Sequence, residues 1–203
     1  MAGAGPRERG RPNRRDRARN RDAILDVAGE FFRSDGDQVT LVAIARAAGL
    51  STATVYRHFA RVDQVSDAYL LRVVEQLAVF SHDCPADGAE LFGLVAGRWG
   101  ALVEQNGAAM VQLRSRRGLL ARLAEGDPVI TTVRVAWERP LRALMASDGI
   151  PATQFLTALQ LCNALLDPRE ILDRAGGDLT VSQATRQLAE ALRGALRTLA
   201  TPT

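Results

Sequence analysis

The chain has 203 residues, of which 47% are hydrophobic and 5% aromatic, and its formal net charge is +3. This length suffices for one all-helical domain or for a small module joined to a larger one, and the apolar content is ample for a core. No apolar run approaches the roughly 20 residues that cross a bilayer, and the arginine-rich start lacks the apolar segment of a secretory signal. Cys84 and Cys162 match no metal-ligand spacing, so we expect reduced thiols in the cytoplasm and no cofactor.

Positive charge is concentrated at the N-terminus. Residues 1–21 contain eight arginines and two acidic residues, a net charge of +6, so the rest of the chain carries −3. A stretch of Gly, Pro and Arg cannot bury apolar surface, so residues 1–20 are predicted to be a disordered basic arm. An arm of this charge can displace counterions from nucleic-acid phosphates or enter a minor groove. The alternative is a solubilising tail without a specific role.

Residues 21–66 are predicted to form a module of three helices. The first covers residues 22–34, where apolar side chains recur at helical spacing. The second covers residues 41–48 behind Thr40, and the third covers residues 52–59 behind Ser51; both hydroxyls can cap a first turn. Between them Gly49 suits the left-handed conformation that ends a helix. Two short helices joined in this way are typical of helix-turn-helix DNA-binding modules.

The third predicted helix has one apolar and one polar face. Val55 and Phe59 lie four residues apart and are expected to pack inward. The other face carries short polar groups, an aromatic hydroxyl and cations, from Thr52, Ala53, Tyr56, Arg57 and His58. This face suits DNA, although two ordinary packed helices with a polar outer face would give the same local pattern.

A longer pattern surrounds these two helices and runs from residue 24 to residue 59 without a gap. Its members are Ile24, Leu25, Ala28, Phe31, Phe32, Gly36, Thr40, Leu41, Ile44, Ala45, Ala48, Gly49, Leu50, Ser51, Ala53, Thr54, Val55, Tyr56, His58 and Phe59. In this pattern the chain resembles the TetR family of bacterial transcriptional regulators. That family usually carries a lysine where this chain has Val62, so we expect Arg61 to take over the lysine's phosphate contact.

The resemblance implies that the helix beginning at Thr52 enters the major groove of an operator with two inverted half-sites. Thr52, Ala53 and Arg57 are best placed for base edges, since an arginine can make a bidentate contact with guanine. Thr40, Ser51, Tyr56, His58 and Arg61 are expected to hold phosphates and fix the register. The full predicted DNA-binding set is Thr40, Ser51, Thr52, Ala53, Thr54, Tyr56, Arg57, His58 and Arg61.

Residues 67–203 are predicted to form a larger helical domain. A helix over residues 63–80 runs into it from the DNA-binding module, and helices follow over residues 87–105 and 107–123, the latter interrupted around Gly118. Asp127 can cap the next helix, which runs to residue 146 and should be kinked or split by Pro140. The last helices cover residues 151–166 and 181–199, with a glycine turn between them. The predicted fold class is therefore all-α.

The two final helices are the predicted dimer seam. Residues 155–166 are apolar nearly all round, which requires burial on every side, and residues 181–199 carry a stripe with several small side chains. TetR-like proteins dimerise through such a pair, and the resemblance implies the same homodimer here. The expected interface is Phe155, Leu159, Cys162, Leu188, Leu192 and Ala195. The alternative is a monomer whose core is centred on these helices.

TetR-like regulators generally bind a small-molecule effector within the larger domain. No segment of this chain matches a ligand-specific signature, so the candidates are large apolar and embedded polar side chains, a usual composition for such a site. They are Phe92, Trp99, Met110, Arg134, Trp137, Phe155 and Asn163. The alternative is that these side chains are ordinary core residues.

An enzyme is a different class that the sequence disfavours. The chain has two histidines and no nucleophile-elbow, metalloprotease, P-loop or dinucleotide-binding pattern. His82, Asp83 and Cys84 are adjacent, but adjacent side chains point in different directions. A protein-interaction module that does not bind DNA is a further alternative, disfavoured by the polar face and the basic arm. We therefore predict a cytoplasmic, dimeric repressor that a small-molecule effector releases from its operator, with activation as the alternative mode.

Overall fold

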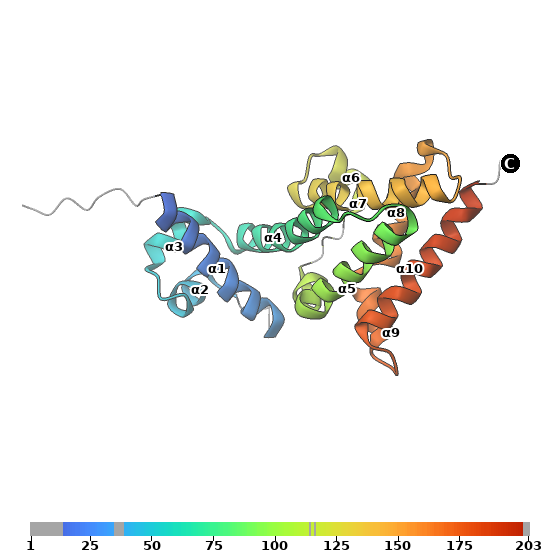
Figure 1. The fold of residues 1–203 in the computed structure, drawn as a ribbon. Coiled ribbons are helices and arrows are strands. Elements are labelled where there is room, and N and C mark those ends of the chain that lie inside the picture. The colour runs from blue at the N-terminus through green and yellow to red at the C-terminus, as the bar shows by residue number, and fades with distance from the viewer. Residues whose placement is uncertain (1–13, 35–38, 114, 116, 201–203) are drawn as a thin grey trace, which may run out of the picture.

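The computed structural model describes residues 14–34, 39–113, 115 and 117–200. Over these ranges the chain forms helices and no strand, which confirms the predicted all-α class (Figure 1). The elements are α1 (Arg14–Ser34), α2 (Leu41–Ala47), α3 (Thr52–His58), α4 (Val62–Asp83), α5 (Gly88–Gln112), α6 (Leu119–Ala124), α7 (Pro128–Ser147), η2 (Ala152–Gln154), α8 (Phe155–Leu165), α9 (Pro168–Ala175), α10 (Val181–Arg197) and η3 (Thr198–Ala200). None of these described helices is long and apolar enough to cross a membrane.

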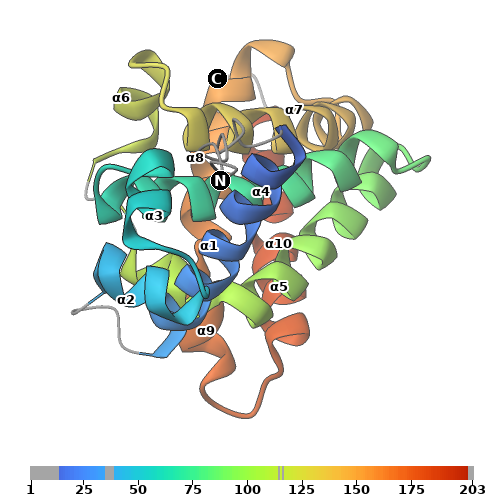
Figure 2. The same cartoon turned by 90° about the vertical axis from the view of Figure 1, so that its left-hand side faces the viewer.

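The first three helices form the small module at one end of the molecule (Figures 1 and 2). Apolar side chains from all three meet in its core, where Ile24, Ile44 and Val55 are fully buried. Ala45 is also buried, because α2 and α3 approach each other closely there. Gly49 has φ +64°, the left-handed conformation expected for the turn between them.

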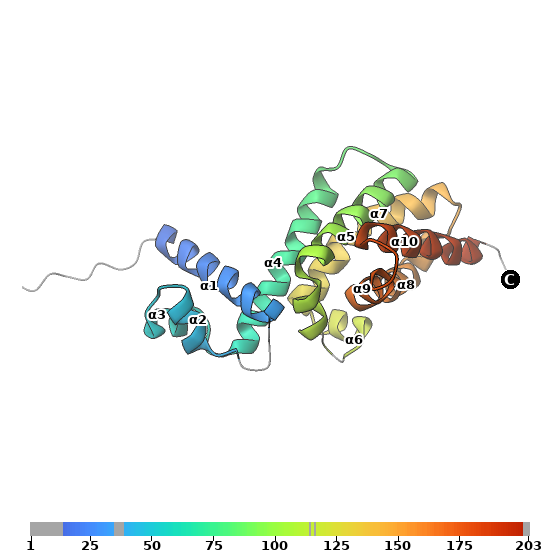
Figure 3. The same ribbon diagram turned by 90° about the horizontal axis from the view of Figure 1, so that it is seen from below.

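Helix α4 leaves this module and runs into the larger domain, as Figures 1 and 3 both show. There it packs against α5 and α7, with Val73 and Leu77 buried. Helices α8, α9 and α10 lie beyond α5 and α7. One continuous helix therefore joins the two parts of the molecule.

The connection between α4 and α5 is fixed to α7 by a single arginine. The guanidinium of Arg139 donates hydrogen bonds of 2.7–2.8 Å to the backbone carbonyls of Ser81, Cys84 and Ala86. These carbonyls lie at and just beyond the end of α4, where a helix leaves its last acceptors without intrahelical partners. Arg139 thereby satisfies three acceptors at once and holds the turn of the chain in place.

Several features of the helices differ from those predicted. Helix α1 begins at Arg14, so residues 14–20 of the predicted disordered arm are helical, with an Arg19–Asp16 ion pair at 3.4 Å; residues 1–13 of that arm lie outside the described residues. Helix α5 continues past residue 105 because Gly107 lets Leu172 of α9 approach; an added Cβ would lie 2.8 Å from Leu172 Cδ1. Helix α7 passes through Pro140 without being split.

Candidate DNA interface and ligand cavity

The two short helices α2 and α3 are set by side-chain caps. Thr40 Oγ1 accepts a hydrogen bond from the backbone N–H of Ala43 at 3.1 Å, and Ser51 Oγ accepts one from that of Thr54 at 3.2 Å. In the turn, the N–H of Leu50 donates to the carbonyl of Ala45 at 2.9 Å. These local bonds fix the angle at which α3 leaves α2.

The predicted polar face of α3 is exposed to solvent. Val55 and Phe59 are 0% and 5% exposed, whereas Tyr56 is 53% exposed. Thr52, Ala53 and Arg57 are exposed as well. Arg57 Nε donates to the carbonyl of Ala53 at 3.2 Å, so its side chain lies back along the helix. The three residues predicted to contact base edges therefore lie on one exposed face.

Several residues of the predicted DNA-binding set have other partners in this structure. Thr54 is half-buried and its hydroxyl bonds to Ser51 Oγ at 2.8 Å, so both hydroxyls serve the cap of α3. Arg61 makes two hydrogen bonds with the carboxylate of Asp63, at 2.6 and 3.1 Å. The sequence identified Arg61 but not the carboxylate that neutralises it.

Arginines of α1 add to this surface. The helix begins at the same end of the molecule as α3 (Figures 1 and 2), and the guanidinium of Arg21 lies 5.5 Å from the ring centre of Phe59. The pKa of His58 is lowered, first by partial burial and then by the charges of Arg17, Arg21 and Arg57. The positive charge that the sequence assigned to a flexible arm thus continues, in residues 14–21, along an ordered helix beside α3.

The larger domain contains a partly open cavity of about 200 Å³. Its wall is built from α4, α5, α6, α7 and the α8–α9 region, together with the chain between α5 and α6. It includes Leu70, Val74, Trp99, Met110, Leu113, Ser115, Arg117, Gly118, Leu119, Arg122, Val129, Ile130, Val133, Trp137, Cys162, Asn163, Leu166, Asp167 and Pro168. Four of the predicted ligand-binding residues line it, namely Trp99, Met110, Trp137 and Asn163.

The other three predicted ligand-binding residues lie elsewhere. Phe92 packs behind the cavity against Trp137, with ring centres 6.2 Å apart. Arg134 is exposed and pairs with Glu138 at 3.5 Å. Phe155 is buried beneath the guanidinium of Arg142, 4.2 Å from its ring centre. Helical periodicity shows which residues face inward, but it does not separate a cavity wall from the solid core behind it.

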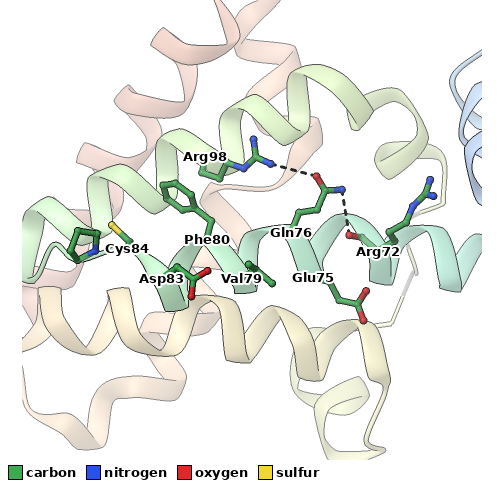
Figure 4. Close-up of a pocket in the computed structure, with 9 residues that line it drawn as sticks. Arg72, Glu75, Gln76, Val79, Phe80, Asp83, Cys84 and Arg98 are labelled. Atoms are coloured by element: carbon green, nitrogen blue, oxygen red, sulfur yellow. Dashed lines mark hydrogen bonds between the residues drawn. The ribbon is translucent and has the colours of Figure 1, made fainter. Parts of the chain in front are cut away.

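A second depression lies outside the bundle, between α4 and α5 (Figure 4). It has a volume of about 880 Å³, and Val79 on its floor is 60% exposed. Gln76 bridges its two sides, accepting from Arg98 at 3.4 Å and donating to the carbonyl of Arg72 at 3.5 Å. This depression is larger than the cavity, but it is a surface groove, whereas the cavity is walled by several helices.

The predicted dimer residues are mostly internal to one chain. Phe155, Leu159, Cys162 and Leu192 are at most 5% exposed, and Leu188 and Ala195 are half-buried. The faces of α8 and α10 that reach solvent are instead the neighbouring ones, with Leu156 48% exposed and Ala191 and Gly194 exposed. The predicted stripe faces the chain's own core, because α10 packs closely on α5; a Cβ added at Gly100 would lie 2.6 Å from Thr185 Oγ1.

The described helices thus form a helix-turn-helix module with an exposed polar third helix, joined by one long helix to a domain with an internal cavity. This architecture is typical of helical regulators that bind DNA. The sequence model of the bacterial regulatory proteins of the tetR family matches residues 24–64, the segment that forms the module. Residues 24–64 are thus similar to the DNA-binding segment of tetR-family regulators, in sequence as well as in helix order.

Solved structures of tetR-family regulators share the fold. A TetR-family transcriptional regulator from Streptomyces coelicolor is 20% identical, with a TM-score of 0.62; the match covers 85% of this chain and 80% of that one. A Mesorhizobium loti structure assigned to the same family is 19% identical, with a TM-score of 0.51; the match covers 90% of this chain and 96% of that one. No curated protein sequence matches the chain.

Proposed function

We propose that the chain is a TetR-family transcriptional regulator that acts in the cytoplasm as a homodimeric repressor, and that a small molecule in the cavity releases it from its operator. The observation that carries the DNA-binding part is the contrast across α3, where Val55 is fully buried while Thr52, Ala53 and Arg57 lie together on the exposed face. Short polar and cationic side chains on an exposed helix can enter a major groove and contact base edges.

Within this proposal the residues divide into two groups. Thr52, Ala53 and Arg57 contact bases, whereas Thr40, Ser51, Tyr56, His58 and Arg61 hold phosphates; Thr54, the remaining member of the set, lies beside Ser51 at the cap of α3. Arg17 and Arg21 add phosphate contacts, because their charges lie beside His58 at the end of α3. Phosphate contacts position the protein, whereas base contacts specify the sequence.

The dimer forms through the exposed faces of α8 and α10. Leu156 is a large apolar side chain left 48% exposed, while Ala191 and Gly194 are small and exposed on α10. Small residues allow two helices to approach closely, and an isologous pairing of these faces buries Leu156 on both subunits. Such a dimer imposes its two-fold symmetry on the operator, which therefore has inverted half-sites.

The effector acts through α4. Leu70 and Val74 of this helix line the cavity, and the N-terminal end of the same helix packs against the DNA-binding module. A ligand that binds more tightly to an arrangement with wrongly spaced α3 helices shifts the population toward it. Release then follows from the differential affinity of the two arrangements, without contact between ligand and DNA.

The test is fluorescence anisotropy with the duplex upstream of the protein's own coding sequence, together with footprinting and sedimentation. We expect a complex of two chains that protects two inverted half-sites. Arg57→Ala should weaken specific binding by about 1–3 kcal/mol and relax the preference at one or two base pairs per half-site. Arg169→Ala, which removes an exposed arginine of α9, is the matched control. Equal affinity for a random duplex of the same length would contradict the proposal.

A further inference from the structure

We propose that the cavity takes an uncharged small molecule, an aromatic or apolar ring carrying one hydrogen-bond acceptor, and that Trp137 and Asn163 recognise this acceptor. The inference deepens the effector-binding part of the proposed function and rests on it. It is carried by three features of the cavity: two polar groups without partners, the pairing of the charges in the wall, and the volume.

The two tryptophans of the chain both line the cavity, but their ring nitrogens differ. Trp99 Nε1 donates a hydrogen bond to the carbonyl of Leu166 at 2.7 Å, so this N–H is already used. Trp137 is 4% exposed, and its N–H has no partner among the described residues. A buried indole N–H normally finds an acceptor, so Trp137 lacks a partner that a ligand can provide.

The position of this N–H follows from a second observation. Among the described residues, no side-chain nitrogen or oxygen is both sealed from solvent and without a partner. The N–H of Trp137 therefore meets open space, and the cavity is the open space that Trp137 lines. Asn163 lines the same cavity, and its amide also has no hydrogen-bond partner among the described residues. Together they offer a ligand donors from two different helices, α7 and α8.

The described charged side chains of the wall are paired. Arg122 bonds to Asp127 at 2.9 Å, and Arg117 bonds to Glu125. Asp167 caps α9, accepting from the backbone N–H of Arg169 at 2.9 Å. An ionic ligand would lose much of its hydration in this largely apolar cavity without a free partner of opposite charge, which is costly. The wall therefore favours an uncharged ligand.

The charge state of the Arg122–Asp127 ion pair supports the preference for an uncharged ligand. Burial on its own raises the pKa of Asp127, but hydrogen bonds from Arg122 and from the backbone N–H groups of Ile130 and Val129 outweigh it, and the pKa lies below its ordinary value. Asp127 is therefore ionised at neutral pH and neutralises Arg122.

The volume of the cavity and the chemistry of the Cys162 thiol restrict the class of ligand further. Benzene occupies an engineered apolar cavity of about 150 Å³, so about 200 Å³ accommodates a single ring with a short substituent. Burial raises the pKa of the Cys162 thiol, which therefore stays protonated and is a poor nucleophile. The ligand is held by packing and hydrogen bonds and not by a covalent bond to this cysteine.

Four probes of nearly the same size test the proposal. Acetophenone has a ring and one neutral acceptor, ethylbenzene lacks the acceptor, benzoate is an anion and benzylamine is a cation at neutral pH. Full-length protein labelled with 5-fluorotryptophan gives a fluorine resonance for each tryptophan, and both tryptophans lie in the cavity wall. Titration without DNA then gives a dissociation constant for each probe. We expect acetophenone to bind about twofold to tenfold more tightly than ethylbenzene, and both ions to bind at least about tenfold more weakly than acetophenone.

Variants identify the groups that recognise the acceptor. Trp137→Phe keeps a ring and removes the N–H, Asn163→Leu removes the amide, and Val135→Ala is the control, on α7 but 59% exposed. We expect Trp137→Phe and Asn163→Leu each to reduce the preference for acetophenone over ethylbenzene, and the control to retain it. Circular dichroism checks that each variant is folded. If either Trp137→Phe or Asn163→Leu fails to fold, the other variant still tests the proposal.

Three results would overturn the proposal. These are tighter binding of benzoate or benzylamine than of acetophenone, an unchanged acetophenone preference in the folded variants, and no shift of either resonance with any probe. Because the titration contains no DNA, its failure is separate from failure of the proposed function. If acetophenone binds as expected but leaves the operator complex intact, the ligand class stands and release by ligands of this class fails.

Discussion

The phenol of Tyr69 on α4 donates a hydrogen bond of 2.8 Å to the side-chain oxygen of Asn106 on α5. The ring of Tyr69 also packs edge-on against Phe32 of α1, with ring centres 5.7 Å apart. Asn106 is fixed in turn, because its amide donates to the carbonyl of Leu102 at 2.9 Å. One side chain thus connects the DNA-binding module to the helix that carries Trp99 and Met110 of the cavity wall.

Removing this hydrogen bond should loosen the junction between the two parts. Tyr69→Phe keeps the ring and deletes the hydroxyl, which should lower the free energy of unfolding by about 0.5–1.5 kcal/mol. Burial raises the pKa of the Tyr69 phenol, so the hydroxyl is protonated at neutral pH and the effect should not vary between pH 6 and 8. Urea denaturation of Tyr69→Phe, Asn106→Ala and the double variant measures the coupling, and additive single effects would show that the bond contributes nothing.

Gly29 allows the ring of Tyr69 to approach α1. A Cβ added at Gly29 would lie 2.6 Å from Cε2 of Tyr69, whereas one added at Gly97, in the exposed face of α5, would meet nothing within 4 Å. Gly29→Ala should therefore destabilise the protein by about 1–3 kcal/mol. Gly97→Ala, the matched control, should stabilise it by about 0.5–1 kcal/mol, because alanine loses less backbone entropy in a helix. Urea denaturation measures both, and the same sign for both variants would contradict the prediction.

The DNA-binding module could be predicted from the sequence because its determinants are local. The caps at Thr40 and Ser51, the turn at Gly49 and the inward spacing of Val55 and Phe59 all lie within a short stretch of chain. Each of these features is fixed by neighbours a few residues away. An aspartate followed by a proline is a local signal of the same kind, and it begins α7 at Asp127. Asp167 and Pro168 begin α9 in the same way, although α9 was not among the predicted helices.

The helices of the larger domain were harder to predict from the sequence, because their boundaries and buried faces depend on contacts between residues far apart in the chain. Gly107 looked like a helix end, yet it lies inside α5 because Leu172 packs against it. Leu192 and Leu159 were predicted at a dimer seam, yet they are buried within one chain. A helix that is apolar on most sides does not indicate which side faces its own domain and which a partner, since the period is the same for both.

The carboxylate of Asp148 links the end of α7 to α10 and should make stability sensitive to acid. Arg193 bonds to it at 2.9 and 3.0 Å, and Arg197 at 3.2 Å, while its side chain is 8% exposed. Hydrogen bonds from Arg193 hold the pKa of Asp148 below its ordinary value, and Arg197 lowers it further despite the opposing effect of burial. A lowered pKa in the folded state means that this carboxylate stabilises the protein above the unfolded pKa.

This contribution should be lost as the pH falls from about 4 through the lower pKa of the folded state. The free energy of unfolding of the wild type should therefore fall more steeply below about pH 4 than that of Asp148→Asn, which has no carboxylate to titrate. Asp178→Asn, at an exposed position before α10, should keep the wild-type slope. Urea titrations at a series of pH values measure the slopes. Parallel curves for the wild type and Asp148→Asn would show that the ion pair does not contribute to the acid sensitivity.

Arg61 is held by Asp63 at the start of α4, and this pair should limit the affinity for DNA. Because the carboxylate lies 2.6 Å from the guanidinium, a phosphate must compete with it for Arg61. Asp63→Asn removes one negative charge from the surface beside α3 and releases Arg61 from the ion pair. We expect tighter binding to operator and to random duplexes alike, since a phosphate contact carries no sequence information. The slope of log K against log salt should steepen by about 0.9, the value for one further phosphate contact.

Asp173→Asn on α9, exposed and remote from α3, makes the same change in net charge and should leave the slope unchanged. Anisotropy titrations at several salt concentrations separate the two variants. If Asp63→Asn bound DNA no better than Asp173→Asn and with the same salt slope, Arg61 would not be a phosphate-binding residue.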